Sequence, residues 1–153
     1  MSNKSSRSNS SATSYDRDSD EGRESFAFNG LKLKGGSGDD TLTGGALNDK
    51  IEGGRGADRI DGGAGNDKIE GGKGNDILTG GTGADIFEFE RGDGRDVITD
   101  FSAAQGDRLH LDDHVAYTVA QVGSDVVVSL SSGDQVTLTG VSLAQLPAGW
   151  ITL

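Results

Sequence analysis

Six aspartates recur every nine residues, and they are the side chains of this sequence best suited to chemistry. They fill the sixth place of six consecutive nine-residue units, which run from Gly35 to Glu88 and each open with Gly-Gly. Carboxylates are hard oxygen ligands for metal ions, and the units contain no Cys or His, which argues against zinc or copper. We therefore expect metal ligation, rather than a merely solvated acidic face, at Asp40, Asp49, Asp58, Asp67, Asp76 and Asp85.

The rest of each unit predicts the elements that position these carboxylates. A bulky apolar residue always fills the eighth place, and the last three residues form a short strand pattern with one apolar side. Because one unit cannot bury a core alone, units must stack, and two units make a coil of 18 residues with two strands and two turns. We expect Leu42, Ile60 and Leu78 to stack in one sheet and Ile51, Ile69 and Phe87 in the facing sheet.

Stacked coils would place the carboxylates in two columns, one along each edge of the roll. Equivalent turns would be about 4.8 Å apart, the spacing of neighbouring strands. A calcium ion midway between two coils spans about 4.6–5.2 Å, whereas a magnesium ion spans only about 4.1 Å. The spacing therefore predicts calcium as the bound ion.

Glycines at the second and fourth places are expected to bring backbone carbonyls close to the ions. Glycine adopts positive φ freely and has no Cβ to obstruct a neighbouring coil. Leu47 replaces the fourth-place glycine of the second unit, which predicts weaker calcium binding at the Asp49 turn without loss of its place in the stack. The candidates are Gly36, Gly38, Gly54, Gly56, Gly63, Gly65, Gly72, Gly74, Gly81 and Gly83.

A degenerate seventh unit and a different pattern follow the repeats. After a two-residue insertion, RGDGRDVIT keeps the repeat phase, which predicts Asp96 as a further ligand that would share an ion with Asp76. Beyond Asp100, three strand-like runs separated by turn sequences predict an antiparallel meander that closes the roll, with Trp150 and Ile151 packed against it. The runs are 117–122, 126–130 and 135–138.

The sequence thus predicts an all-β chain in three parts. Residues 1–25 are Ser-rich, charged and nearly free of aliphatic residues, as in a disordered tail. Residues 26–99 would form the parallel β-roll, including a leading strand at 26–34 that caps the first coil. Residues 100–153 would form the antiparallel β cap and a region read for secretion.

The nonapeptide resembles the RTX calcium-binding repeat of bacterial proteins secreted by type I exporters. From Gly80 onward, the motifs GADIFEF, GDGRDVITDF and GDRLHL are similar to the region after the repeats in serralysin-type proteases and alginate (mannuronan) C5-epimerases. The resemblance implies calcium as the bound ion, a type I secretion apparatus that reads an uncleaved C-terminal segment, and an extracellular location. The N-terminus agrees, since it lacks the apolar run of a cleavable signal. Gly149 stands where such proteins often carry an acidic residue before the apolar end.

Composition excludes several classes of function. A net charge of −11 makes nucleic acid an improbable partner, because phosphate backbones require Lys and Arg. No apolar stretch is long enough for an integral membrane segment. The sequence has no Cys and no nucleophile motif, and His110 and His114 lack a third ligand at metal-site spacing. We therefore expect no catalysis by this chain.

Two roles remain open beyond calcium binding coupled to folding outside the cell. The first is a free-standing extracellular structural or matrix protein, which the Met at residue 1 favours. The second is an accessory module that binds an anionic, alginate-like polysaccharide for a carbohydrate-active enzyme.

Overall fold

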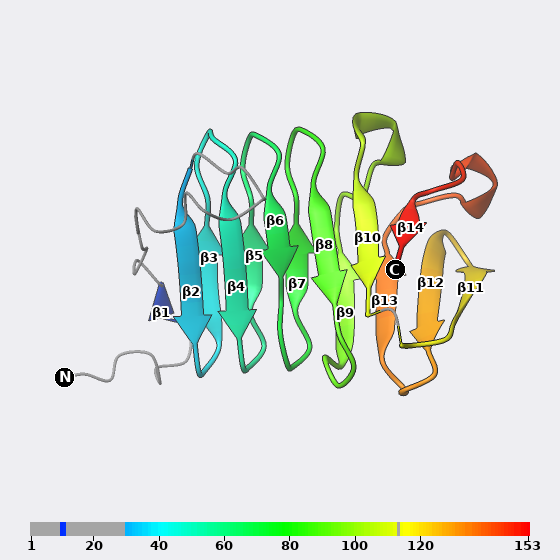
Figure 1. Cartoon of the computed structure of the whole chain (residues 1–153), viewed down its shortest axis with the longest axis horizontal. Helices are drawn as coiled ribbons and strands as arrows, with labels where there is room; N and C mark the ends of the chain where they lie inside the picture. The colour runs from blue at the N-terminus through cyan, green and yellow to red at the C-terminus, as the bar shows by residue number, and fades with distance from the viewer. Residues whose placement is uncertain (1–9, 12–29, 113) are drawn as a thin grey trace.

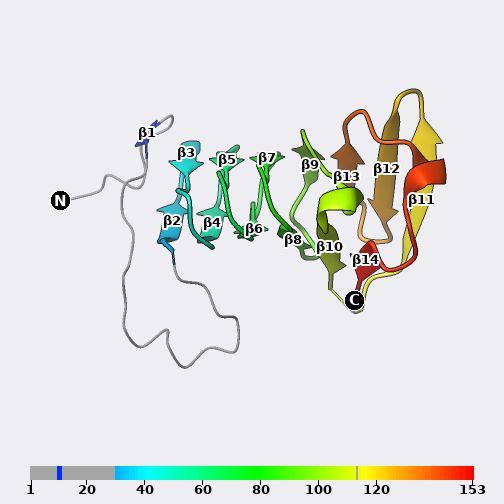
Figure 2. The ribbon, with the colours of Figure 1, turned by 90° about the horizontal axis from the view of Figure 1, so that it is seen from above.

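Two β-sheets face each other across a narrow core. The computed structural model describes residues 10–11, 30–112 and 114–153, and its coils stack in a row (Figure 1) that broadens at the C-terminal end (Figure 2). Among the described residues, the short 3-10 helices η3 (Ala103–Gln105) and η4 (Leu143–Gln145) lie in connections. The strands are β1 (Ser10–Ser11), β2 (Lys32–Gly36), β3 (Asp40–Thr43), β4 (Lys50–Gly54), β5 (Arg59–Asp61), β6 (Lys68–Glu70), β7 (Ile77–Thr79), β8 (Ile86–Phe89), β9 (Arg95–Ile98), β10 (Arg108–Leu111), β11 (Tyr117–Val122), β12 (Asp125–Leu130), β13 (Gln135–Leu138) and β14 (Ile151–Thr152).

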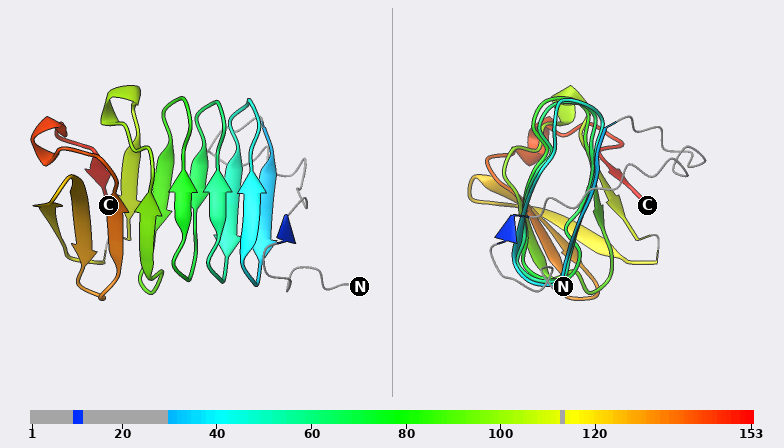
Figure 3. Two further views of the ribbon diagram at one scale, coloured as in Figure 1. Left: turned by 180° about the vertical axis from the view of Figure 1, so that it is seen from behind. Right: turned by 90° about the vertical axis from the view of Figure 1, so that its left-hand side faces the viewer.

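Each coil contributes one strand to each sheet, because the apolar eighth residue of every unit points inward. The first sheet has the order β1-β3-β5-β7-β9-β13-β12-β11, and the second has the order β14-β10-β8-β6-β4-β2. Viewed along the roll, successive coils superpose as one narrow loop (Figure 3). The predicted stacking is confirmed: Leu42, Ile60 and Leu78 are in register in the first sheet, and Ile51, Ile69 and Phe87 in the second.

The C-terminal region closes the roll by extending both sheets (Figure 2). β11, β12 and β13 form the predicted antiparallel meander, and β13 also pairs in parallel with β9 of the roll. β14 pairs in parallel with β10. The buried Trp150 ring packs edge-on against Phe101, with centroids 5.9 Å apart, so the end of the chain seals the core.

The roll extends past the predicted boundary at residue 100. β10 pairs in parallel with β8, and Leu109 stands opposite Phe87, so residues 108–111 belong to the second sheet rather than to the antiparallel cap. The predicted tail lies outside the described residues, except for Ser10–Ser11, which pair in parallel with β3. Within the described part of the chain, we find no helix of the length and apolarity needed to cross a membrane.

Candidate metal centre

Eight aspartates form two columns along the edges of the roll. In both columns, the backbone N–H of one aspartate donates to Oδ1 of the aspartate one coil further on, at 2.7–2.9 Å. The turns from the second sheet to the first, at the bottom of Figure 1, form the Asp40 edge, and the turns at the top form the Asp49 edge. The columns are Asp40, Asp58, Asp76 and Asp96 on the Asp40 edge, and Asp49, Asp67, Asp85 and Asp107 on the Asp49 edge.

The second carboxylate oxygen of these side chains is left without a partner at four positions. Oδ2 is buried and accepts no hydrogen bond from the described residues in Asp58, Asp67, Asp76 and Asp85. Burying a polar atom without a partner costs free energy, and the cost is larger for a charged one. A cation beside each oxygen would remove that cost. Four orphaned oxygens at equivalent positions are therefore the feature expected of a repeated ion site.

The first-place glycine of each turn stands against this oxygen. A Cβ added to Gly62 would lie 2.5 Å from Oδ2 of Asp67 and 2.7 Å from the carbonyl oxygen of Gly80, one coil further on. The same pair of contacts recurs at Gly53. A carboxylate oxygen and a backbone carbonyl thus converge beside each of these glycines, in a space that any other residue would fill.

The glycines predicted from the second and fourth places all have positive φ, between 85° and 127°. For eight of the ten, an added Cβ would overlap the carbonyl oxygen of the equivalent residue one coil earlier, as at Gly54 above Gly36. Only glycine permits coils to stack this closely in the left-handed conformation. Ligation by the carbonyls of these residues stays a prediction: Gly36, Gly38, Gly54, Gly56, Gly63, Gly65, Gly72, Gly74, Gly81 and Gly83.

Burial raises the pKa of the column carboxyls. On the Asp49 edge, desolvation raises the pKa of Asp67 to about 7 and that of Asp85 to about 8, and neighbouring aspartates add to the rise. On the Asp40 edge, desolvation likewise raises the pKa of Asp58 to about 7, of Asp76 to about 6 and of Asp96 to about 8. In the absence of metal, the folded turns therefore keep these carboxyls protonated to a higher pH than usual, and a binding cation would displace those protons.

Backbone carbonyls would have to complete any ion site in these turns. Among the residues that the structure describes, no three His, Cys, Asp or Glu side chains lie close enough together to hold a metal ion. Calcium accepts carbonyl oxygens together with carboxylates, whereas zinc and copper prefer His and Cys side chains. The donors available here therefore fit calcium.

Asp107 belongs to the Asp49 edge although the sequence analysis did not include it. Its Oδ1 accepts the N–H of Asp85 at 2.9 Å, which continues the column by one coil. The signal in the sequence is the spacing: Asp107 precedes Leu109 by two residues, as Asp85 precedes Phe87. The first-place glycines were also missed, although every unit opens with one.

Near the C-terminal end of the roll, two carboxylates accept backbone N–H groups whose equivalents in earlier turns, such as that of Gly62, donate to a carbonyl. Asp100 accepts the N–H groups of Gly80 and Gly81 at 2.9 and 2.8 Å on the Asp49 edge. Asp134 accepts those of Gly92 and Gly94 at 2.8 and 2.9 Å on the Asp40 edge. These side chains satisfy amides that would otherwise lack a partner.

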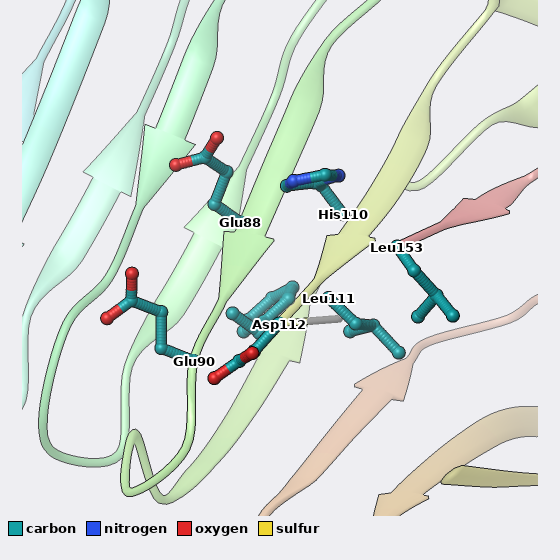
Figure 4. A pocket seen from close by; sticks show the side chains of 7 residues that line it. Glu88, Glu90, His110, Leu111, Asp112 and Leu153 are labelled. Carbon is teal, nitrogen blue, oxygen red and sulfur yellow. The ribbon is translucent and has the colours of Figure 1, made fainter. Parts of the chain in front are cut away.

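A hollow of about 460 Å³ lies on the outer face of the second sheet over β8 and β10 (Figure 4). Glu88, Glu90, His110 and Asp112 line it, but Glu88 is paired with Lys68 at 2.9 Å. The Nδ1 atom of His110 lies 3.0 Å from Oγ1 of Thr152. The hollow therefore presents separate surface polar groups and not a metal centre.

Comparison with known proteins identifies the repeat. The family described as "RTX calcium-binding nonapeptide repeat (4 copies)" matches residues 34–69 and 61–98. An endo-1,3-1,4-beta-glycanase, EglC of Rhizobium meliloti (strain 1021), is 41% identical over 72 residues, which are 44% of this chain and 16% of that enzyme. The chain thus spans about a sixth of the curated relative that it matches.

Two solved structures share the fold and are about a third identical in sequence to this chain. Both are solution structures of subunits of a mannuronan C5-epimerase from Azotobacter vinelandii. The AlgE6R3 subunit is 34% identical, with 74% of this chain and 77% of that chain covered and a TM-score of 0.58. The AlgE6R2 subunit is 33% identical, with 74% and 86% covered and a TM-score of 0.59.

Proposed function

This chain belongs to the RTX calcium-binding repeat family, and from that premise we propose that it binds calcium between its coils and folds as it does so. One observation carries the proposal, namely the buried and unpartnered Oδ2 atoms of Asp58, Asp67, Asp76 and Asp85. Each would share an ion with carbonyls of the adjoining coil, as Asp67 would with Gly80. The positive charge of calcium would offset the burial of the carboxylates.

Folding should depend on the ion because the rest of the chain supplies little stabilisation. Only 32% of the residues are hydrophobic and 26 are glycine, which loses more backbone entropy on folding than any other residue. From β2 to β7, each strand contributes a single buried apolar side chain to the core. We expect the chain to remain unfolded at the low calcium concentration of the cytosol and to fold at the millimolar concentrations outside the cell.

Far-UV circular dichroism during a calcium titration tests this coupling. We expect little β signal in EGTA and a cooperative gain of β signal as calcium rises to about 10 mM. Magnesium at the same concentration serves as the control and should have little effect. An unchanged β signal across the calcium titration would end the proposal.

The proposal includes export and a non-catalytic role outside the cell. The support is the family of the repeat. A type I exporter would read the C-terminal segment. Deleting residues 139–153 leaves β2 to β13 in place, so co-expression with such an exporter should then leave the protein in the cell pellet. Secretion of this truncated chain would contradict the export route.

A role in binding an anionic polysaccharide is the second candidate. The relatives found are named as a mannuronan epimerase and a glycanase. On the Asp40 edge, five exposed cations have no ion-pair partner among the described residues, although the exposed acids Asp39 and Glu90 share that edge. Ion pairs to Glu52 or Glu88 instead hold lysines of the second sheet, namely Lys34, Lys50 and Lys68. The cations are Arg55, Arg59, Lys73, Arg91 and Arg95.

Calorimetry with oligouronates in millimolar calcium tests this candidate. We expect binding heat that falls when Arg55 and Lys73, which form a parallel bridge in adjacent turns, are both changed to Ser. The matched control changes Lys34 and Lys50, on the second sheet, to Ser. An absence of heat with the calcium-loaded protein would count against polysaccharide binding and leave calcium binding untouched.

A further inference from the structure

The turn of the second repeat differs in conformation from the other turns. In the other five units, the second-place glycine has φ between 85° and 97°, whereas Gly45 does not adopt this positive-φ conformation. The fourth place of this unit is Leu47, where the other five units have a glycine with positive φ. A leucine rarely adopts that conformation because its Cβ approaches the following carbonyl oxygen. The backbone of this turn therefore differs from that of the other turns at Gly45.

The partners of the Asp49 carboxylate also differ from those in the other turns. The N–H of Gly45 donates to Oδ2 of Asp49 at 2.7 Å, while Oδ1 accepts the N–H of Leu31 at 2.6 Å. Both oxygens of Asp49 are thus occupied by protein. In the next coil on the same edge, Asp67 also uses Oδ1 to accept an N–H, but its Oδ2 has no partner.

The carboxylate itself has not moved out of the column. An added Cβ on Gly44 would lie 2.5 Å from Oδ2 of Asp49, as one on Gly62 would from Oδ2 of Asp67. Backbone hydrogen bonds to the next coil are also kept, since the backbone carbonyl oxygen of Asp49 accepts the N–H of Lys68 at 2.9 Å. Beside Oδ2 of Asp49, the amide hydrogen of Gly45 therefore stands where a cation would bind.

We propose that the Asp49 turn binds no metal ion, and that Leu47 is the residue that prevents binding there. The proposal rests on calcium binding by the other turns. An amide hydrogen and a cation compete for the same oxygen and repel each other, so Asp49 would stack without an ion. Ions on the Asp49 edge would then begin at Asp67, and the two edges would carry unequal numbers of calcium ions.

Calcium stoichiometry tests the inference directly. Equilibrium dialysis and calorimetry in saturating calcium should give one more bound ion for Leu47→Gly than for the wild-type chain. Leu47 is 53% exposed, so the substitution removes no core side chain. Leu47→Ala is the matched control, because alanine also shortens the side chain but does not favour positive φ. It should leave the number of ions unchanged.

Asp49→Asn supplies the complementary measurement. It should leave the stoichiometry unchanged, because the amide oxygen still accepts one of the two N–H groups, whereas Asp67→Asn should remove at least one ion. The inference is wrong if Leu47→Gly binds the same number of ions as the wild type, or if Asp49→Asn binds fewer. If neither the wild type nor Leu47→Gly bound calcium, calcium binding itself would fail along with the inference.

Discussion

Replacing Asp67 by Asn should change stability in opposite directions with and without calcium. Oδ1 of Asp67 accepts the N–H of Asp49 at 2.8 Å, and Asn retains an oxygen for that bond. Oδ2 is buried without a partner, and burial raises the pKa of the carboxyl to about 7. At pH 8 without calcium, the substitution therefore removes an ionised group that the fold disfavours.

The two effects are large enough to measure. After solvent screening is allowed for, removing the buried charge should stabilise the metal-free fold by about 1–2 kcal/mol at pH 8. A calcium site with a dissociation constant near 10⁻⁴ M stabilises the fold by about 2.7 kcal/mol at about 10 mM calcium. Loss of one such site exceeds the gain, so the sign of the effect reverses when calcium is added.

Far-UV circular dichroism at pH 8 follows both effects. In EGTA, trimethylamine N-oxide favours compact states because it is excluded from the protein surface, and the Asn variant should fold at a lower osmolyte concentration than the wild type. In a calcium titration, the same variant should need more calcium. Asp61→Asn is the control, since Asp61 is exposed and accepts the N–H of Gly63 at 3.0 Å. Destabilisation of Asp67→Asn under both conditions would refute the reasoning.

The stability of the fold should also respond to pH, to a core substitution and to a substitution at a turn glycine. The folded-state pKa values of the column carboxyls lie above the ordinary value of 3.8, so the metal-free fold should lose stability as pH rises from about 4 to about 8. Osmolyte-induced folding in EGTA should therefore need less osmolyte at pH 5 than at pH 8. The reverse order would contradict this prediction. Ile69→Ala, at a fully buried position in the second sheet, should cost about 2–5 kcal/mol in urea denaturation with calcium, against a smaller cost for the half-buried Ile77→Ala. Gly63→Ala should cost at least about 1–2 kcal/mol, because Gly63 has φ of 91° and its Cβ would overlap the Gly45 carbonyl. Gly45→Ala should be tolerated, since nothing lies within 4 Å of its added Cβ; equal costs at the two glycines would argue against the turn geometry.

The column geometry followed from the sequence because it depends on one short period. An apolar residue every nine residues fixes two strands per coil, and parallel stacking then places residues 18 apart in register, as for Asp40 and Asp58. Local turn and strand signals likewise predicted the three strands of the meander. The metal role of the columns stays a prediction, which the calcium titration is designed to test.

Contacts between segments far apart in the chain were decided only by the tertiary structure. No period links β13 to β9 or β14 to β10, which pair across about 40 residues. The sequence also does not distinguish Asp49 from Asp67, since both residues follow Asn and precede Lys. Yet Oδ2 of Asp67 has no partner among the described residues, whereas Oδ2 of Asp49 accepts a hydrogen bond. Their difference lies in the N–H of Gly45, which donates to Oδ2 of Asp49, and the direction of an amide depends on the path of the folded turn. Repetition therefore determined where the carboxylates stand, whereas the local course of the backbone decided which of their oxygens are left for an ion.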